Sequence, residues 1–180
     1  MMIENNEAGV FSSKIGWLTA MGGDSSEDCY NRLIGSFTDL NFEMLNTTSG
    51  LLIYYKNKGD LKSVKMLARW CIEYVDNIRK TDEACFFDKI KCSYLTAESY
   101  ACFKSGDKEK AAELLAEAFE LARFFDSSEE KTSDIIKLFE YKKEIASFSL
   151  LGETGMDSIE SSLNLINDKK FTSLWNKINR

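Results

Sequence analysis

The stretch FKSGDKEKAAELLAEAFELARFF, residues 103–125, predicts the fold because two helical patterns meet within it. After the pair Gly106–Asp107, small and apolar residues recur at steps of four and three, which is the spacing of one face of an α-helix. These residues are Ala111, Leu115, Ala118, Ala122 and Phe125. Asp107 can cap the free amides of this helix, and Gly106 can adopt the left-handed backbone that ends the preceding one. The pair therefore predicts a tight turn between two antiparallel helices.

The same turn recurs along the chain. The pair is repeated at Gly23–Asp24 and Gly59–Asp60, and a looser version, Gly155–Met156–Asp157, follows later. In this last version Asp157 takes the capping position, and an acidic residue three positions on completes an approximate capping box. Each interval between turns is long enough for one helical hairpin. We therefore predict an all-α antiparallel helical-hairpin array of about four helix pairs with a capping helix over residues 170–179, forming a single domain over residues 1–180.

The composition fits a folded chain and argues against several kinds of partner. Of the 180 residues, 44% are hydrophobic and 12% aromatic, which is enough for a sizeable core. The net charge of −6 does not give the broad positive potential of nucleic-acid-binding proteins, so we expect no direct nucleic-acid contact. No apolar run is as long as a membrane span, and the acidic N-terminus lacks the pattern of a signal peptide. We therefore expect a cytoplasmic protein without membrane contact.

Cysteine and histidine usage argues against catalysis and metal binding. The chain has no histidine, which is the commonest general base, and its five cysteines show no CxxC spacing. Each cysteine lies among apolar residues, which predicts small buried side chains. These cysteines are Cys29, Cys71, Cys85, Cys92 and Cys102. No phosphate loop, dinucleotide fingerprint or nucleophile elbow occurs. We therefore expect a non-enzymatic protein with no catalytic residues, no metal and no cofactor.

A pattern of small residues surrounds the turn within residues 91–125. Its members are Ser99, Cys102, Phe103, Gly106, Asp107, Ala111 and Ala118. A weaker copy surrounds the preceding turn and contains Tyr55, Gly59, Asp60, Val64, Ala68 and Cys71. This pattern resembles a tetratricopeptide repeat, which implies a stack of helical hairpins. The proline that closes such repeats is absent, and Glu98 stands where a large apolar residue is usual.

The resemblance implies a binding surface, because the first helix of each such repeat lines a concave groove that holds a peptide. Carried onto this chain position by position, the groove residues are Trp17, Ile53, Lys56, Asn57, Thr96, Tyr100, Phe103 and Lys104. The alternative is that the aromatic residues among them are core residues between helices. The lysine and asparagine pair with which some repeats bind a terminal carboxylate is absent, which argues against that mode of binding.

Four cations around the second turn are spaced four, three and four residues apart, which is the spacing of one helical face. They are Lys58, Lys62, Lys65 and Arg69. Such a face can receive an acidic peptide or a phosphate-bearing partner. The alternative is an ordinary solvated helix face.

The C-terminal stretch KKFTSLWNKINR, residues 169–180, has one apolar face. That face contains Phe171, Leu174, Trp175 and Ile178. We predict that this helix caps the end of the array, because a terminal repeat must hide its apolar face. The alternative is a basic amphipathic helix that binds a membrane or a partner groove.

These observations favour a non-enzymatic scaffold that binds a peptide or protein partner. A first alternative is a regulatory, ligand-sensing or dimerisation domain, in which the chain would form a homodimer. This alternative rests on the stretches LLAEAFELARFFD and FTSLWNKIN. Their residue pattern resembles that of the C-terminal regions of some bacterial helix-turn-helix transcriptional regulators. A second alternative is an accessory subunit of an enzyme complex. An open groove with exposed apolar residues favours the scaffold, whereas a self-complementary apolar flank favours dimerisation.

Overall fold

The computed structural model describes residues 48–78, 84–129 and 154–179. The chain divides into two compact units, Met1–Thr47 and Thr48–Arg180, where the sequence predicts one domain. All described residues belong to the second unit. Three predicted features lie outside them: the turn at Gly23–Asp24, the groove residue Trp17 and the buried thiol of Cys29.

The elements of the described part are helices. Residues 48–58 form a helical segment, followed by α3 (Leu61–Ile78), α4 (Phe86–Lys104), α5 (Lys108–Ser127), α7 (Gly155–Ile166) and α8 (Lys169–Ile178). The all-α fold class is therefore confirmed for these residues, and α8 agrees with the predicted C-terminal helix to within one residue at each end. None of the described helices has both the length and the apolar character that a bilayer-crossing helix needs.

Two of the predicted Gly-Asp turns are confirmed, and both glycines have the left-handed backbone. The φ angle is +72° at Gly59 and +92° at Gly106. Asp107 caps α5 by accepting a hydrogen bond of 3.1 Å from the amide of Lys110. Asp60 accepts hydrogen bonds from the amide and the hydroxyl of Ser63, at 3.1 and 2.7 Å. Each pair therefore ends one helix and begins the next, as their chemistry predicts.

The third turn differs from its prediction. The cap of α7 is Thr154, whose Oγ1 accepts from the amide of Asp157 at 2.9 Å, while Asp157 Oδ2 accepts from the amide of Thr154 at 3.0 Å. The prediction that Asp157 is itself the cap was therefore wrong. Gly155 lies in the first turn of α7, where a Cβ would stand 2.7 Å from the Cα of Ala122 in α5. Because Gly155 has no Cβ, it allows α7 to pack closely against α5, and it does not form a left-handed turn.

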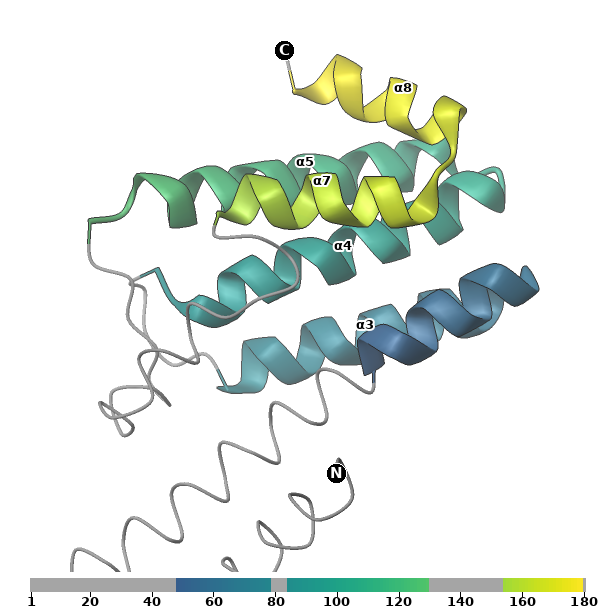
Figure 1. Ribbon diagram of the computed structural model, residues 1–180, viewed down its shortest axis with the longest axis horizontal. Helices are drawn as coiled ribbons and strands as arrows, with labels where there is room; N and C mark the ends of the chain where they lie inside the picture. The colour runs from purple at the N-terminus through teal and green to yellow at the C-terminus, as the bar shows by residue number, and fades with distance from the viewer. Residues whose placement is uncertain (1–47, 79–83, 130–153, 180) are drawn as a thin grey trace, which may run out of the picture. The chain divides into compact units, whose positions relative to one another are not determined.

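Helix α4 is the centre of the packing. It contacts α3, α5 and α7, and Figure 1 shows it lying between α3 on one side and the pair α5 and α7 on the other. The predicted apolar face of α5, which runs from Ala111 to Phe125, is buried throughout and confirmed. The four described cysteines are buried, as predicted: Cys71, Cys85, Cys92 and Cys102.

Small polar residues let the helices approach α4 closely. Ser99 Oγ donates a hydrogen bond of 2.6 Å to the carbonyl of Ala111 in α5, and Ser158 Oγ of α7 donates one of 2.8 Å to the carbonyl of Lys89. At the other end of α5, Asp126 accepts hydrogen bonds from the amides of Gly155 and Met156 at 2.6 and 3.2 Å. The bond from Ser99 thus joins α4 to α5, and the bonds of Ser158 and Asp126 fix the position of α7 against α4 and α5.

Helix α8 buries its apolar face. The ring of Phe171 packs against Tyr100 and Phe103, with centroid distances of 5.4 and 5.5 Å. Trp175 packs edge-on against Phe119 of α5 at 5.8 Å. Phe171 and Trp175 are both buried, which confirms the predicted orientation of this helix.

Candidate functional site

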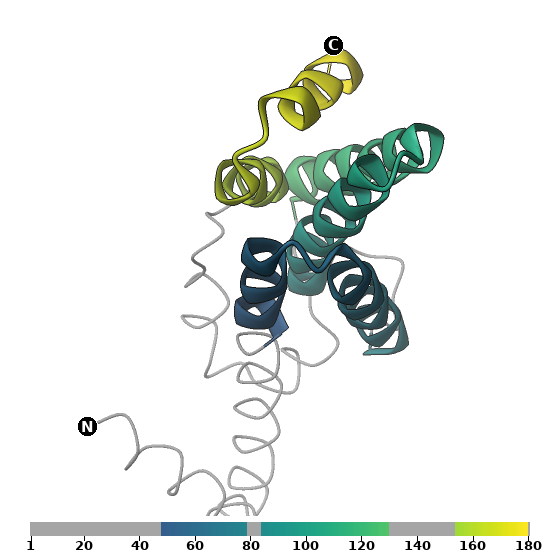
Figure 2. The ribbon, with the colours of Figure 1, turned by 90° about the vertical axis from the view of Figure 1, so that its right-hand side faces the viewer.

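A pocket of about 80 Å³ opens between the helical segment 48–58, α4 and α7. Figure 2 views the helices nearly end-on and shows the segment and α7 on the same side of α4, with α3 on the other side. The segment, α4 and α7 are each the first helix of a described pair, because α3, α5 and α8 follow them directly. One residue of α3, Val64, also reaches the pocket.

The wall of the pocket is largely apolar. Leu52, Val64 and Tyr100 line it and are buried, whereas Ile53 and Leu165 stand at its rim with 40% and 53% of their surface exposed. The pocket is therefore an apolar hollow that continues outward into exposed aliphatic surface. Such a surface suits a ligand that brings its own apolar groups.

Two serine hydroxyls in the wall are already engaged within their own helices. Ser93 Oγ donates to the carbonyl of Ile90, and Ser162 Oγ donates to the carbonyl of Ser158, each at 2.8 Å. Tyr94, which also lines the pocket, has its hydroxyl 3.2 Å from Thr48 Oγ1. Burial raises the pKa of Tyr94 to about 12, so its phenol stays neutral at physiological pH. These three hydroxyls therefore offer few hydrogen bonds to a polar ligand.

Lys56 places a positive charge at the rim. Its Nζ donates a hydrogen bond of 3.0 Å to the carbonyl of Leu165, across the pocket and in the last turn of α7. A cation is favourable there because carbonyl groups at a helix C-terminus carry partial negative charge. Lys56 makes no ion pair with any residue in the described part of the chain. Its charge is therefore available to an acidic ligand.

Lys104 reaches the same corner of the molecule from α4 but is paired. Its Nζ donates a hydrogen bond of 3.0 Å to Asp168 Oδ2, and it lies 6.0 Å from the ring centre of Tyr100. The hydrogen bond from Lys104 lowers the pKa of Asp168 and raises the pKa of Lys104. Asp168 also caps α8 by accepting from the amides of Lys170 and Phe171. The pair therefore holds the turn between α7 and α8 beside the pocket.

The structure brings together only part of the predicted groove. Ile53, Lys56 and Tyr100 line the pocket. Phe103 is half-buried against α8, and Asn57 is exposed outside the pocket lining. Thr96 is fully buried and donates to the carbonyl of Cys92 at 2.8 Å, so the prediction that it faces a groove was wrong.

The four predicted cations do not share one helix. Lys58 belongs to the segment before the Gly59 turn, and its Nζ lies 5.1 Å from the ring centre of Tyr54. The prediction of one face holding all four was therefore wrong, because the turn separates Lys58 from α3. Lys62, Lys65 and Arg69 do follow one another along α3 at helical spacing.

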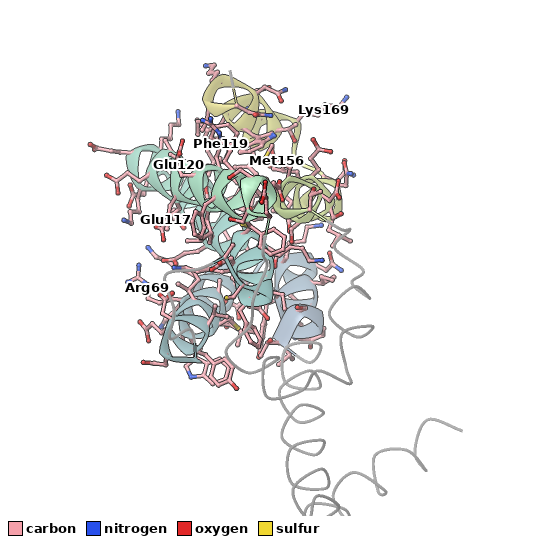
Figure 3. The ribbon with its side chains drawn as sticks, turned by 90° about the vertical axis from the view of Figure 1, so that its left-hand side faces the viewer. Arg69, Glu117, Phe119, Glu120, Met156 and Lys169 are labelled. Carbon is pink, nitrogen blue, oxygen red and sulfur yellow. The ribbon has the colours of Figure 1, made fainter. Side chains whose placement is uncertain are left out.

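The cations of α3 lie away from the pocket. Figure 3 shows Arg69 on the side where α5 carries Glu117 and Glu120, whereas Met156 of α7 is labelled farther to the right. Lys62 and Lys65 make no ion pair with a described residue and do not line the pocket. The apolar pocket and the basic face of α3 are therefore two separate surfaces.

The described residues bring no metal-ligand cluster together. No group of three or more cysteine, aspartate or glutamate side chains is placed to hold an ion within the described ranges. Burial raises the pKa of the Cys71 and Cys92 thiols, which keeps both in the neutral, poorly nucleophilic form.

Sequence reasoning missed the contribution of α7 to the pocket. Ser162, Leu165 and Ile166 line it. The available signal was the adjacent aliphatic pair Leu165–Ile166 at the end of a predicted helix, but nothing in the local sequence shows that this pair meets α4. No family model, curated protein or solved structure matches the chain.

Proposed function

We propose that this chain is a non-enzymatic, cytoplasmic scaffold that binds a peptide or protein partner through the pocket between the segment 48–58, α4 and α7. In this proposal the helix pairs form a tetratricopeptide-like array, whose first helices present the binding surface. The supporting observation is the apolar pocket with its exposed aliphatic rim, formed by Ile53 and Leu165. An apolar anchor in such a pocket is the usual centre of a peptide interface.

Selection from a random peptide library on the immobilised full chain tests this proposal. We expect enriched peptides whose binding is lost in the variant Ile53→Asp, because a carboxylate at the rim makes apolar contact unfavourable. The matched control is Leu51→Asp, since Leu51 lies on the same helical segment with 39% exposure but does not line the pocket. Both side chains are exposed, so each variant should keep its thermal midpoint within a few degrees. Enriched peptides that bind both variants alike would refute the proposal.

A second candidate function is self-association, which a separate apolar stripe on α3 favours. Met66 and Trp70 are exposed at 67% and 46%, and Trp70 stacks on Tyr74 with a centroid distance of 5.8 Å. These residues recur at steps of four and so share one side of the helix. Sedimentation of the full chain and of Trp70→Asp tests this candidate: a dimer that becomes a monomer in the variant supports it, and a monomer in both excludes it.

A further inference from the structure

Three properties of the pocket together indicate the chemistry of its ligand, and the first is size. A cavity of about 150 Å³ is the kind that holds a benzene molecule. The pocket here has about 80 Å³, which is too small to enclose an aromatic ring but suits a branched aliphatic group. An anchoring valine, leucine or isoleucine side chain therefore fits inside, whereas phenylalanine or tryptophan would remain largely outside.

The second property is the largely apolar wall, to which Leu52, Val64 and Ile166 contribute. The hydroxyls of Ser93 and Ser162 are donated to carbonyls of their own helices, and Tyr94 is neutral and close to Thr48. A polar side chain that entered would exchange water for a largely apolar wall, which is unfavourable wherever a hydrogen bond is not replaced. The wall therefore favours an apolar anchor over a polar anchor of the same size, such as asparagine.

The third property is the cation at the mouth. An ammonium group has three donors, and the Nζ of Lys56 directs one of them to the carbonyl of Leu165. The remaining donors can bind a carboxylate without breaking that contact. Lys104 is less available, because Asp168 already pairs with it. Lys56 is thus the cation that a carboxylate beside the pocket would meet.

The exposed rim of the pocket indicates whether a peptide or a small aliphatic acid is the better ligand. Ile53 and Leu165 extend the apolar surface beyond the hollow and stay exposed. A short carboxylic acid that filled the pocket would leave both side chains in water. A peptide covers them with the residues on either side of its anchor, which buries additional apolar area and strengthens binding. The exposed rim therefore favours a peptide.

From these properties we infer that the pocket selects peptides in which one branched aliphatic residue is followed or preceded by an acidic residue, with the aliphatic side chain in the pocket and the carboxylate on Lys56. This inference rests on the proposed function and gives it a substrate class. It assigns Lys56 to charge recognition and the cavity to size selection.

Capped synthetic peptides of the sequence Ser-Glu-Leu-Glu-Ser test the inference by titration into the full chain, followed by NMR shifts of backbone amides. Exchanging the central leucine for alanine should weaken binding at least about tenfold, because each lost methylene is worth about 0.8 kcal/mol. A central phenylalanine should also bind more weakly than leucine. Exchanging both glutamates for glutamine should weaken binding several-fold and remove most of its salt dependence.

Variants of the protein separate charge recognition from general electrostatics. Lys56→Met should bind the glutamate and glutamine peptides equally, whereas Lys56→Arg should keep the preference for glutamate. The matched control is Lys177→Met, an exposed lysine of α8 outside the pocket lining, which should keep the full preference. Methionine retains an apolar stem of similar length, so the packing of the rim is conserved.

The outcomes distinguish the inference from the function on which it rests. A phenylalanine peptide that binds as tightly as the leucine peptide, or equal effects of Lys56→Met and Lys177→Met, would refute the ligand class. Library peptides that depend on Ile53 but carry aromatic or basic anchors would refute the ligand class and retain the scaffold function. If neither the synthetic nor the library peptides bind at the pocket, both proposals fail.

Discussion

Arg69 of α3 donates two hydrogen bonds to a single oxygen of Glu98 in α4, from Nε at 3.1 Å and from Nη2 at 2.7 Å. The side chain of Glu98 is only 2% exposed, whereas that of Arg69 is 54% exposed. The arginine therefore reaches inward from the surface to neutralise a carboxylate that has lost its water. This contact explains how an acidic residue is buried where α3 packs against α4.

The pair predicts a specific stability effect. Arg69→Met should lower the free energy of unfolding by about 1–3 kcal/mol, because the buried carboxylate of Glu98 loses its donors. Lys62→Met, on the same helix and without an ion pair to any described residue, should change it by less than about 0.5 kcal/mol. Urea unfolding followed by circular dichroism measures both. The double variant Arg69→Met with Glu98→Leu should recover part of the loss, since an apolar pair replaces the buried charge.

The contact between α7 and α5 leads to a second prediction. Gly155→Ala should destabilise the fold by roughly 1–3 kcal/mol, because its Cβ would collide with the backbone of Ala122. Gly50→Ala is the matched substitution: Gly50 is also helical, but nothing lies within 4 Å of the position of its Cβ. It should stabilise the protein by up to about 1 kcal/mol. Equal thermal midpoints for the two variants would contradict the close approach of α7.

Local chemistry explains why the sequence predicts two of the turns correctly. The left-handed backbone is needed at Gly59 and Gly106 themselves, and the caps Asp60 and Asp107 bind amides only three residues away. All the determinants of each turn therefore lie within a few neighbouring residues. The turn at Gly59 also separates Lys58 from α3. The sequence contains this turn, but the spacing of the four cations alone does not show that it divides them.

The remaining differences depend on contacts between distant parts of the chain. The role of Gly155 is set by its close approach to Ala122 on another helix. The similarity of Gly155–Met156–Asp157 to a Gly-Asp turn therefore led to a wrong prediction. The resemblance to a helical repeat predicted that Ile53, Lys56 and Tyr100 face a groove, and these three residues do line the pocket. The resemblance did not predict Leu165 as a pocket residue, because the register of α7 against α4 is fixed by tertiary packing.

The buried thiols give a third prediction. In a Cys29→Ser background, which removes the cysteine outside the described residues, the other four thiols should react with a chromogenic disulfide at pH 8 at least about tenfold more slowly than in urea. The physical reason is that all four are buried and that burial raises the pKa of Cys71 and Cys92. Rapid reaction of one or more thiols in the folded protein would show that the core around α4 opens readily.

The last prediction concerns the turn between α7 and α8. The pKa of Asp168 is lowered in the folded protein, chiefly by the hydrogen bond from Lys104. A carboxyl group with a lowered pKa adds stability above its unfolded pKa of about 3.9, and this stability disappears as the pH falls through the folded value. Asp168→Asn keeps the capping oxygen but removes the charge. The wild type should therefore be more stable than Asp168→Asn at pH 6, and the two should converge as the pH falls below the lowered pKa of Asp168.

Urea unfolding at a series of pH values measures this difference. Lys104→Met should remove much of the same pH-dependent contribution, because it takes away the main cause of the lowered pKa of Asp168. Adding Asp168→Asn to Lys104→Met should then have little further pH-dependent effect, since the two residues act through one contact. Parallel pH profiles for the wild type and Asp168→Asn would show instead that the charge of Asp168 does not hold α8 in place, and that the apolar contacts of Phe171 and Trp175 are sufficient.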